Sequence, residues 1–241
     1  MRHPIGHIDY HVVDACNLAC EFCTHYSNFK GPANVMSVDD IRKEWGLWSP
    51  LINPERVHLI GGEPLLNPSI VEIVRLAFQV WNESTICLYS NGLLLKNHPE
   101  LKEALRGGRY ALGLHYGDHR DAETERFVRN FFGPDVEVDI VDGSKEWLQF
   151  YKFDSGIPVP YSDGNPRESW ENCIAGQSRC YVLKSGKLWK CPQVAFADRA
   201  GVSHWFDGYQ PCSVNDDILE WLSREDEHCC SNCPAKPQFT D

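Results

Sequence analysis

The sequence predicts an α/β fold in which a parallel β-sheet, curved into a partial barrel, precedes a small cysteine-rich domain. Three observations lead to this prediction. Strand-like and helix-like segments alternate over the first two thirds of the chain, as in proteins built on a parallel sheet. The pattern changes near Trp147, and the 11 cysteines gather in one group near the front and another in the last third. We therefore expect two domains, residues 1–150 and residues 151–241.

Five segments have the composition of short, buried strands. They are rich in β-branched and other apolar residues, and most end at a turn that contains glycine. We assign these strands to residues 7–13, 57–60, 84–89, 110–114 and 136–141. Because parallel neighbours need a crossover connection, we expect a right-handed helical crossover between successive strands.

Helical signals fill the segments between these strands. Ser37-Val-Asp-Asp resembles a capping box, and apolar residues recur at helical spacing after Asn67-Pro68. We expect helices at residues 37–48, 68–81, 99–105 and 121–132.

The last third of the chain carries a different set of signals. Residues 151–166 are rich in Pro, Gly and Asp and predict a connecting segment. Cys180–Cys191 predicts a β-hairpin that turns at Ser185-Gly186, and residues 216–223 predict a short helix. This part should form the smaller C-terminal β-hairpin and helix domain.

Composition excludes several classes of function. The chain has 241 residues, with 23 Lys+Arg against 34 Asp+Glu and a net charge of −11, which argues against a dedicated nucleic-acid binder. No segment reaches the roughly 18 apolar residues that a membrane helix needs. The first residues lack the apolar core of a signal peptide. We expect a cytoplasmic protein with no membrane partner.

The cysteines predict metal sites. Disulfides are rare in the reducing cytosol, and an odd number of thiols cannot pair completely. Cys16, Cys20 and Cys23 form a C-x3-C-x2-C pattern directly after the first predicted strand. Three thiolates at this spacing can hold three corners of an iron–sulfur cube and leave one iron with an open coordination position. The alternative is a zinc site completed by His25 or by a distant thiol.

This pattern, with aromatic Phe22 before the last cysteine, resembles the signature of the radical S-adenosylmethionine (SAM) superfamily. Gly61-Gly62-Glu63-Pro64 after the second strand resembles the GGE element of that family, and Ser90-Asn91-Gly92 after the third strand is a weaker match. The resemblance implies a partial (β/α)6 barrel of the TIM type. It also implies that the protein is an enzyme that cleaves SAM to a 5′-deoxyadenosyl radical, which then abstracts a hydrogen atom from the substrate.

The resemblance further implies a role for each matching residue. The three cysteines of the loop would hold a 4Fe-4S cluster whose open iron chelates SAM. Phe22 would pack near the adenine, residues 61–63 would meet the methionine amino group, and residues 90–91 would approach the methionine or ribose. Electrons would come from a reductase with a flavodoxin, or from a ferredoxin. The implied cofactor-contacting residues are Phe22, Gly61, Gly62, Glu63, Ser90 and Asn91.

The second group of cysteines resembles the twitch form of the SPASM extension, which holds an auxiliary 4Fe-4S cluster. The matching pattern is Cys173-x12-Gly186-x4-Cys191, followed by Cys230-x2-Cys233. Two assignments stay open, since Cys180 could replace Cys173 and Cys229 could replace Cys230. A structural zinc site is the alternative for the whole group. The expected metal ligands are thus Cys16, Cys20, Cys23, Cys173, Cys191, Cys230 and Cys233.

The remaining thiols allow one more role. Radical epimerases return a hydrogen atom to the substrate from a free cysteine, and Cys212 is our candidate for this donor, with Cys180 as the other. Either residue could instead be a small, buried apolar residue. Cys87 lies within a predicted strand and is expected in the core.

The substrate is predicted from polar residues at or near the carboxyl ends of strands. Such groups suit hydroxyls or an amine, as on a sugar or an aminocyclitol. The chain is also similar in length and cysteine layout to compact twitch members, which include an aminocyclitol alcohol dehydrogenase. This resemblance implies a small, carbohydrate-like substrate whose carbinol carbon is oxidised or epimerised. A peptide maturase that forms a crosslink or an epimer is the alternative enzyme, and an iron–sulfur electron-transfer or zinc-binding module is the alternative without catalysis. The candidate pocket residues are His11, Asp14, His115, Tyr116, Asp118, His119, Asp139 and Asp142, with Trp147, Tyr151 and Trp189 nearby.

Overall fold

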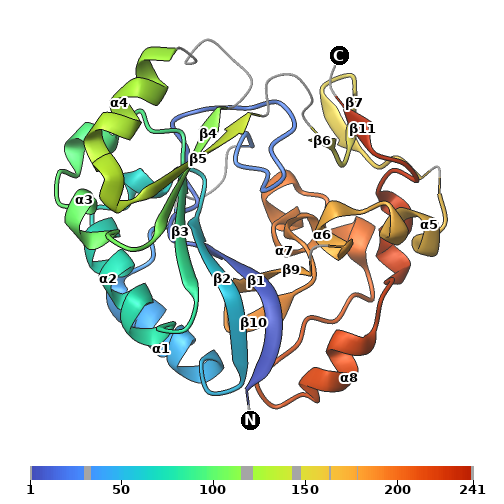
Figure 1. Ribbon diagram of the computed structural model, residues 1–241. Coiled ribbons are helices and arrows are strands. Elements are labelled where there is room, and N and C mark those ends of the chain that lie inside the picture. The colour runs from blue at the N-terminus through green and yellow to red at the C-terminus, as the bar shows by residue number, and fades with distance from the viewer. Residues whose placement is uncertain are drawn as a thin grey trace.

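A seven-stranded sheet forms the centre of the computed structural model (Figure 1), which describes residues 2–29, 34–114, 122–142, 148–162, 164–177 and 179–239. The strand order is β10-β9-β1-β2-β3-β4-β5, and β1 to β5 are parallel. Within the described residues the sheet stays open between β10 and β5. The predicted parallel sheet is therefore confirmed, and its five first strands are β1 (His3–His11), β2 (Ile52–Ile60), β3 (Thr85–Ser90), β4 (Arg109–Leu114) and β5 (Glu137–Asp142).

Four helices cover one face of this sheet, on the left of Figure 1. The Ser37 hydroxyl accepts a hydrogen bond from the Asp40 backbone N–H, so this residue caps the first helix as its sequence predicts. Tyr10 of β1 points toward this layer and donates a hydrogen bond of 2.5 Å to Glu44. No helix in the described residues is long and apolar enough to span a membrane. The four helices are α1 (Val38–Trp48), α2 (Ile70–Val80), α3 (Leu101–Ala104) and α4 (Ala122–Phe132).

The predicted hairpin is confirmed, and it extends the main sheet. Strand β9 (Cys180–Lys184) pairs in parallel with β1, and β10 (Lys187–Trp189) pairs antiparallel with β9. The turn lies at Ser185 and Gly186, whose φ angles of 54° and 72° are left-handed. Trp48 and Glu44 of α1 hydrogen-bond to the backbone of Gly186, so α1 holds the turn in place. The sheet thus crosses the predicted domain boundary, which stays a prediction.

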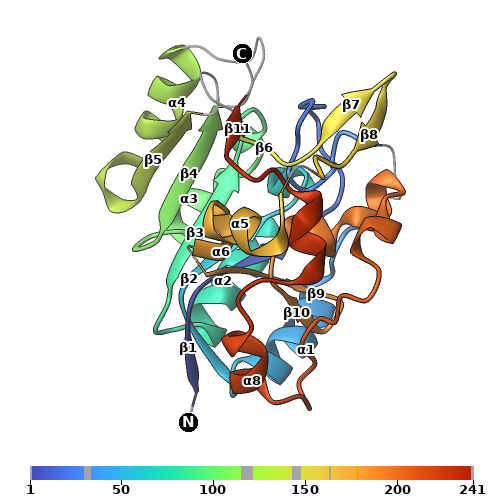
Figure 2. The ribbon, with the colours of Figure 1, turned by 90° about the vertical axis from the view of Figure 1, so that its right-hand side faces the viewer.

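Most of the remaining C-terminal segment packs on the opposite side of the sheet from α1–α4 (Figures 1 and 2). Its last helix instead joins the apolar cluster on the α1–α4 side, where Trp221 contacts Tyr181. Two small sheets accompany the segment, and one of them is a hairpin within the predicted connecting segment. The strands of these sheets are β6 (Leu148–Gln149), β7 (Lys152–Asp154), β8 (Ile157–Val159) and β11 (Gln238–Phe239). The helices are α5 (Pro166–Glu171), α6 (Ile174–Gln177), α7 (Pro192–Ala195) and α8 (Ile218–Ser223), with short 3-10 turns η1 (Pro64–Leu66), η2 (Leu95–Asn97), η3 (Gly133–Asp135), η4 (Ala197–Ala200), η5 (Ser203–Phe206) and η6 (His228–Asn232).

Two apolar clusters stabilise this arrangement. The larger one lies between the sheet and helices α1–α4, includes Trp45 and Trp81, and extends to α8 through Trp221. The smaller one joins the cysteine loop after β1 to the C-terminal segment through Tyr26, Tyr151 and Phe196. Burial of such large aromatic surfaces fixes the loop relative to the segment that covers it.

Candidate functional site

The carboxyl ends of β1, β2 and β3 open onto one cavity of about 690 Å³, a volume that includes open solvent. In a parallel sheet this edge gathers the loops that follow each strand, so motifs far apart in sequence meet there. Tyr89, Gly113 and His25 contribute further walls. We call this space the first cavity, and it is lined by Cys16, Cys20, Cys23, Gly61, Gly62, Glu63, Ser90 and Asn91.

The two glycines after β2 let the backbone run directly against the start of the cysteine loop. A Cβ atom at Gly61 would lie 2.4 Å from the Val13 carbonyl oxygen, and one at Gly62 would lie 2.2 Å from that of Ala15. The Gly62 and Glu63 backbone N–H groups donate hydrogen bonds of 2.9 and 2.8 Å to those same two oxygens. Any side chain at these positions would push the cysteine loop away from β2.

Glu63 joins the ends of β2 and β3. Its side chain is buried at 1% exposure and accepts hydrogen bonds from Ser90 Oγ at 2.6 Å, Asn91 N at 2.9 Å and Leu65 N at 3.0 Å. Burial raises the pKa of Glu63, although these three donors act in the opposite direction. Asn91 Nδ2 also donates 2.8 Å to Asn17 of the cysteine loop. The contact of Glu63 with methionine stays a prediction.

The three thiols of the first cavity differ in acidity. Burial raises the pKa of Cys16 to about 12 and that of Cys20 to about 11. Desolvation also acts on the partly buried Cys23, but a hydrogen bond and the nearby charge of His25 lower its pKa to about 7. Three sulfur donors facing one space fit an iron–sulfur cluster with an open position. His25 lines the same cavity, so it could complete the alternative zinc site, whereas no fourth thiol is among the described lining residues.

Phe22 lies apart from the other predicted cofactor-contacting residues. It packs against Tyr151 and Phe153, with ring centroids 5.9 and 5.6 Å away, and is absent from the lining of the first cavity. Its ring joins the cysteine loop to the β7–β8 hairpin. Its predicted contact with adenine is not tested by this packing.

A second cavity of about 490 Å³, again a volume that includes open solvent, lies in the C-terminal segment. All four predicted auxiliary ligands line it, although Cys173 precedes α6, Cys191 follows β10, and Cys230 and Cys233 belong to η6 and the residue after it. Cys229 lines the same cavity, so its exchange with Cys230 stays open. Cys180 is not among the lining residues, which favours Cys173 as the ligand. Four thiols around one space fit a closed iron–sulfur cluster.

The surroundings of the second cavity are mostly apolar, with one buried ion pair. Burial raises the pKa values of Cys191 and Cys233. Lys190 is only 5% exposed, lines the cavity, and places Nζ 3.2 Å from Glu227. Sequence reasoning missed Lys190, because its position next to a cysteine did not indicate which way its side chain points.

Cys212 occupies a different environment from the one its predicted role requires. Its side chain is fully buried in the larger apolar cluster, and its backbone exchanges two hydrogen bonds of 2.9 Å with Leu188. Cys212 lines neither cavity. This placement does not support Cys212 as a hydrogen donor and matches the alternative of a small apolar residue. Cys87 is buried in β3, as predicted.

The predicted substrate-facing residues divide into several groups. His11 is buried, stacks on Phe196 at 3.9 Å, and lies 3.5 Å from Asp14. Asp14 pairs with Arg199 at 3.0 Å, a contact that joins the C-terminal segment to the loop after β1. Asp139 instead pairs with Arg109 on the neighbouring strand.

Two of the remaining aromatic candidates pack within the C-terminal half. Tyr151 belongs to the smaller apolar cluster, and Trp189 stacks on Tyr209. The other candidates, His115, Tyr116, Asp118, His119, Trp147 and the side chain of Asp142, lie outside the described residues.

Comparison with known proteins identifies a family. The profile of the Radical SAM superfamily matches residues 10–143. A GTP 3',8-cyclase of Aquifex aeolicus (strain VF5) is 32% identical over 108 residues, which are 43% of this chain and 33% of that protein. GTP 3',8-cyclase 1 of Mycobacterium tuberculosis (strain ATCC 25618 / H37Rv) is 32% identical over 120 residues, 47% of this chain and 33% of that protein. The chain thus spans about a third of the length of these curated relatives.

A solved structure shares the fold along nearly its whole length. The crystal structure of BtrN in complex with AdoMet and 2-DOIA superposes with a TM-score of 0.58 at 16% identity. The match covers 97% of this chain and 94% of that one, so it includes the C-terminal segment as well as the parallel sheet.

Proposed function

The chain belongs to the radical SAM superfamily, and on that premise we propose that it oxidises a carbinol carbon of a small, carbohydrate-like substrate. Members of this family use a 4Fe-4S cluster and SAM. The observation that carries the proposal is the second cavity, where four cysteines from three separate segments face one space.

Cys16, Cys20 and Cys23 would hold the SAM-binding cluster. When bound, this cluster and SAM supply the 5′-deoxyadenosyl radical that removes a hydrogen atom from the substrate. The chain positions the site through Gly61 and Gly62, which bring β2 against the cysteine loop, and through Glu63. By accepting from both Ser90 and Asn91, Glu63 holds the end of β3 at the same place. This preorganisation keeps the reacting groups in a fixed orientation.

Cys173, Cys191, Cys230 and Cys233 would hold an auxiliary 4Fe-4S cluster. Oxidation of an alcohol to a carbonyl removes two electrons and two protons. One of each leaves as the abstracted hydrogen atom, the hydroxyl proton passes to a base or to solvent, and one electron remains to be accepted. A closed cluster with four protein thiolates supplies an acceptor for the second electron. Epimerisation needs no such acceptor but needs a thiol that returns a hydrogen atom. Cys212 lies in the apolar core, which removes the support for this candidate donor, and Cys180 remains as the other candidate. The four cysteines of the second cavity are the reason for preferring oxidation.

Polar groups near the first cavity support a hydroxyl-bearing substrate. His25 and Tyr89 line that cavity, and His11, Asp14 and Arg199 cluster at the end of β1. Such groups can exchange hydrogen bonds with hydroxyl or amine substituents. The reductant would be a reduced flavodoxin or ferredoxin.

The experiment is anaerobic turnover of the reconstituted chain with dithionite and SAM. Carbohydrate and aminocyclitol alcohols labelled with deuterium at the carbinol carbon are compared with GTP and with candidate peptides. We expect deuterium in 5′-deoxyadenosine and a carbonyl product with one of the alcohols only. Deuterium transfer from GTP or a peptide would replace the proposed substrate class. No 5′-deoxyadenosine with any compound would leave an electron-transfer or zinc-binding module as the better explanation.

A further inference from the structure

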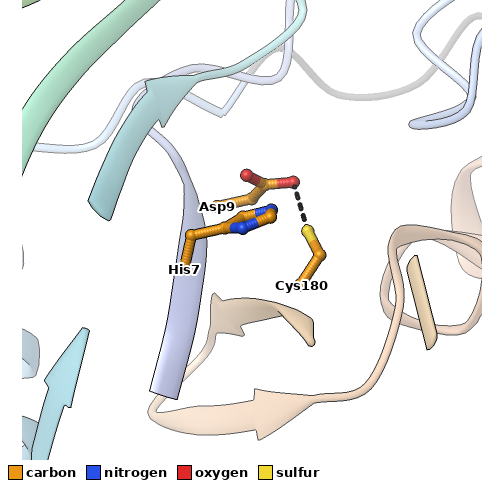
Figure 3. Close-up of side chains that lie close together, drawn as sticks. All are labelled: His7, Asp9 and Cys180. Carbon is orange, nitrogen blue, oxygen red and sulfur yellow. Dashed lines mark hydrogen bonds between the residues drawn. The ribbon is translucent and has the colours of Figure 1, made fainter. Parts of the chain in front are cut away.

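Three potential metal ligands that neither cysteine site uses lie together on the face of the sheet opposite α1–α4 (Figure 3). They are His7 and Asp9 of β1 and Cys180 of β9, and their ligand atoms all lie within 4.8 Å of one another. Asp9 and Cys180 are each 8% exposed. The group therefore combines buried oxygen and sulfur donors with the nitrogen donors of a partly buried imidazole.

Two rigid strands hold these side chains together. His7 pairs directly with Cys180 in the parallel register of β1 and β9, so the two side chains lie side by side. Asp9 follows two residues later on β1 and therefore projects from the same face as His7. Donor groups on neighbouring strands keep their spacing better than donors on loops, which favours a preformed site.

A fourth side chain orients the carboxylate. The His58 Nδ1–H donates to Asp9 Oδ1 at 2.9 Å, which leaves Oδ2 toward Cys180 Sγ at 3.3 Å. The rings of His7 and His58 lie 4.5 Å apart. A ligating carboxylate that is held by a neighbouring imidazole is the arrangement seen around protein-bound metals.

We propose that His7, Asp9 and Cys180 bind one zinc ion, which joins β9 of the C-terminal segment to β1. The donor set suits zinc, because imidazole nitrogen, carboxylate oxygen and thiolate sulfur are its usual ligands, whereas Mg²⁺ and Ca²⁺ prefer oxygen alone. One carboxylate and one thiolate balance the charge of a divalent ion. Binding replaces the thiol proton of Cys180, which is released to solvent. Water would complete a four-coordinate site.

The site lies between the two cysteine cavities. Asp9 interacts electrostatically with His25 of the first cavity, and Cys180 with Cys173 and Cys191 of the second. A metal bridge here would hold the C-terminal segment, and with it the second cavity, against the sheet. A metal-bound Cys180 would also be unable to return a hydrogen atom to a substrate.

The test uses the chain with both iron–sulfur sites reconstituted, so that zinc cannot occupy their cysteines. Metal analysis after zinc addition and gel filtration should find about one zinc beside about eight irons per chain. Replacement of zinc by Co²⁺ should give a thiolate-to-cobalt charge-transfer band. Cys180→Ser should remove this band and the bound zinc, and His7→Gln should weaken zinc binding at least tenfold. Cys87→Ser is the matched control, because Cys87 is a buried strand thiol that lines neither cavity.

Three results would overturn the proposal. The reconstituted wild-type chain could bind neither zinc nor cobalt, in which case the Asp9–His58 and Asp9–Cys180 contacts form a metal-free hydrogen-bond network. Binding could persist unchanged in both variants, which would indicate adventitious metal elsewhere. Zinc binding could also fall in Cys87→Ser as much as in Cys180→Ser, which would show that the loss is not specific to the proposed ligands. If Cys180→Ser fails to fold, His7→Gln decides alone, because His7 is only partly buried and its replacement should be tolerated. The iron content of the His7→Gln variant reports whether both clusters remain.

Discussion

The two cysteine cavities are built in opposite ways. Cys16, Cys20 and Cys23 lie within one loop, at the edge where β1, β2 and β3 end. The second cavity collects its cysteines from three segments that the chain brings together by packing α5, α6, the end of β10 and η6. A local spacing therefore specifies the first site, whereas the second depends on tertiary contacts.

The charges that face the two cavities also differ. The first contains the buried carboxylate of Glu63, which three donors hold in place. The second contains the buried ammonium of Lys190, which pairs with Glu227. A fixed cation stabilises the more negative form of a nearby group, and a fixed anion destabilises it. Glu227 lines the second cavity as well, so that site carries both members of an ion pair, whereas the first carries a carboxylate with no paired cation among its described lining residues.

The largest effect is expected from Cys20→Ser in the first cavity. Loss of one of three ligands should lower 5′-deoxyadenosine formation at least a hundredfold and reduce iron from about eight to about four atoms per chain. Chromatographic detection of 5′-deoxyadenosine and iron analysis measure these effects. Cys87→Ser should change neither quantity. Undiminished SAM cleavage by Cys20→Ser would show that this loop does not hold the SAM-binding cluster.

Cys191→Ser should separate the two sites. We expect iron near four atoms per chain and loss of the carbonyl product, while 5′-deoxyadenosine still forms, because the first cavity remains intact. Cys229→Ser is the companion variant, since Cys229 lines the same cavity. If Cys230 is the ligand, Cys229→Ser should keep about eight irons. Full iron content in Cys191→Ser would contradict the auxiliary site.

Gly62→Ala tests the close approach that builds the first cavity. The new Cβ would lie 2.2 Å from the Ala15 carbonyl oxygen, so the cysteine loop must move. We expect the free energy of unfolding to fall by about 1–3 kcal/mol and SAM binding to weaken about tenfold. Urea unfolding and equilibrium dialysis with SAM measure the two effects.

Gly46→Ala is the matched control for that prediction. Gly46 lies within α1, and a Cβ there would meet no atom within 4 Å. Alanine should raise stability by about 0.5–1 kcal/mol through its better helix propensity. Equal effects of the two substitutions would disprove the steric explanation.

Lys190→Met is expected to have the smallest effect. Removal of the buried cation should make the auxiliary cluster harder to reduce. The ratio of reduced to oxidised cluster should fall about tenfold, which is equivalent to a reduction potential lower by about 59 mV for one electron. An EPR-monitored redox titration measures this shift. The exposed Lys187 provides the control through Lys187→Met. Similar potentials in both variants would mean that the Lys190 ammonium does not influence the potential of the auxiliary cluster.

Much of the fold follows from local patterns. The period of the apolar residues and the glycine-containing turns predict the five parallel strands, because each strand must be buried between helices and the opposite layer. The same patterns place the C-x3-C-x2-C, GGE and SNG motifs at one edge, and the structure gathers them there. Local patterns did not show that β9 pairs with β1, since partner and register depend on side chains distant in sequence.

The sequence by itself determined the family, the strand and helix order, and the loop that carries the first three cysteines, because each depends on residues close together in the chain. Only the tertiary structure decided that Cys212 is buried in the core while Cys180 meets His7 and Asp9. Both residues are cysteines in the last third of the chain, and the sequence offers no pattern that distinguishes their environments. Their environments differ because Cys180 lies on β9, which pairs with β1 and so places Cys180 beside His7. The Cys212 backbone instead pairs with Leu188 of β10.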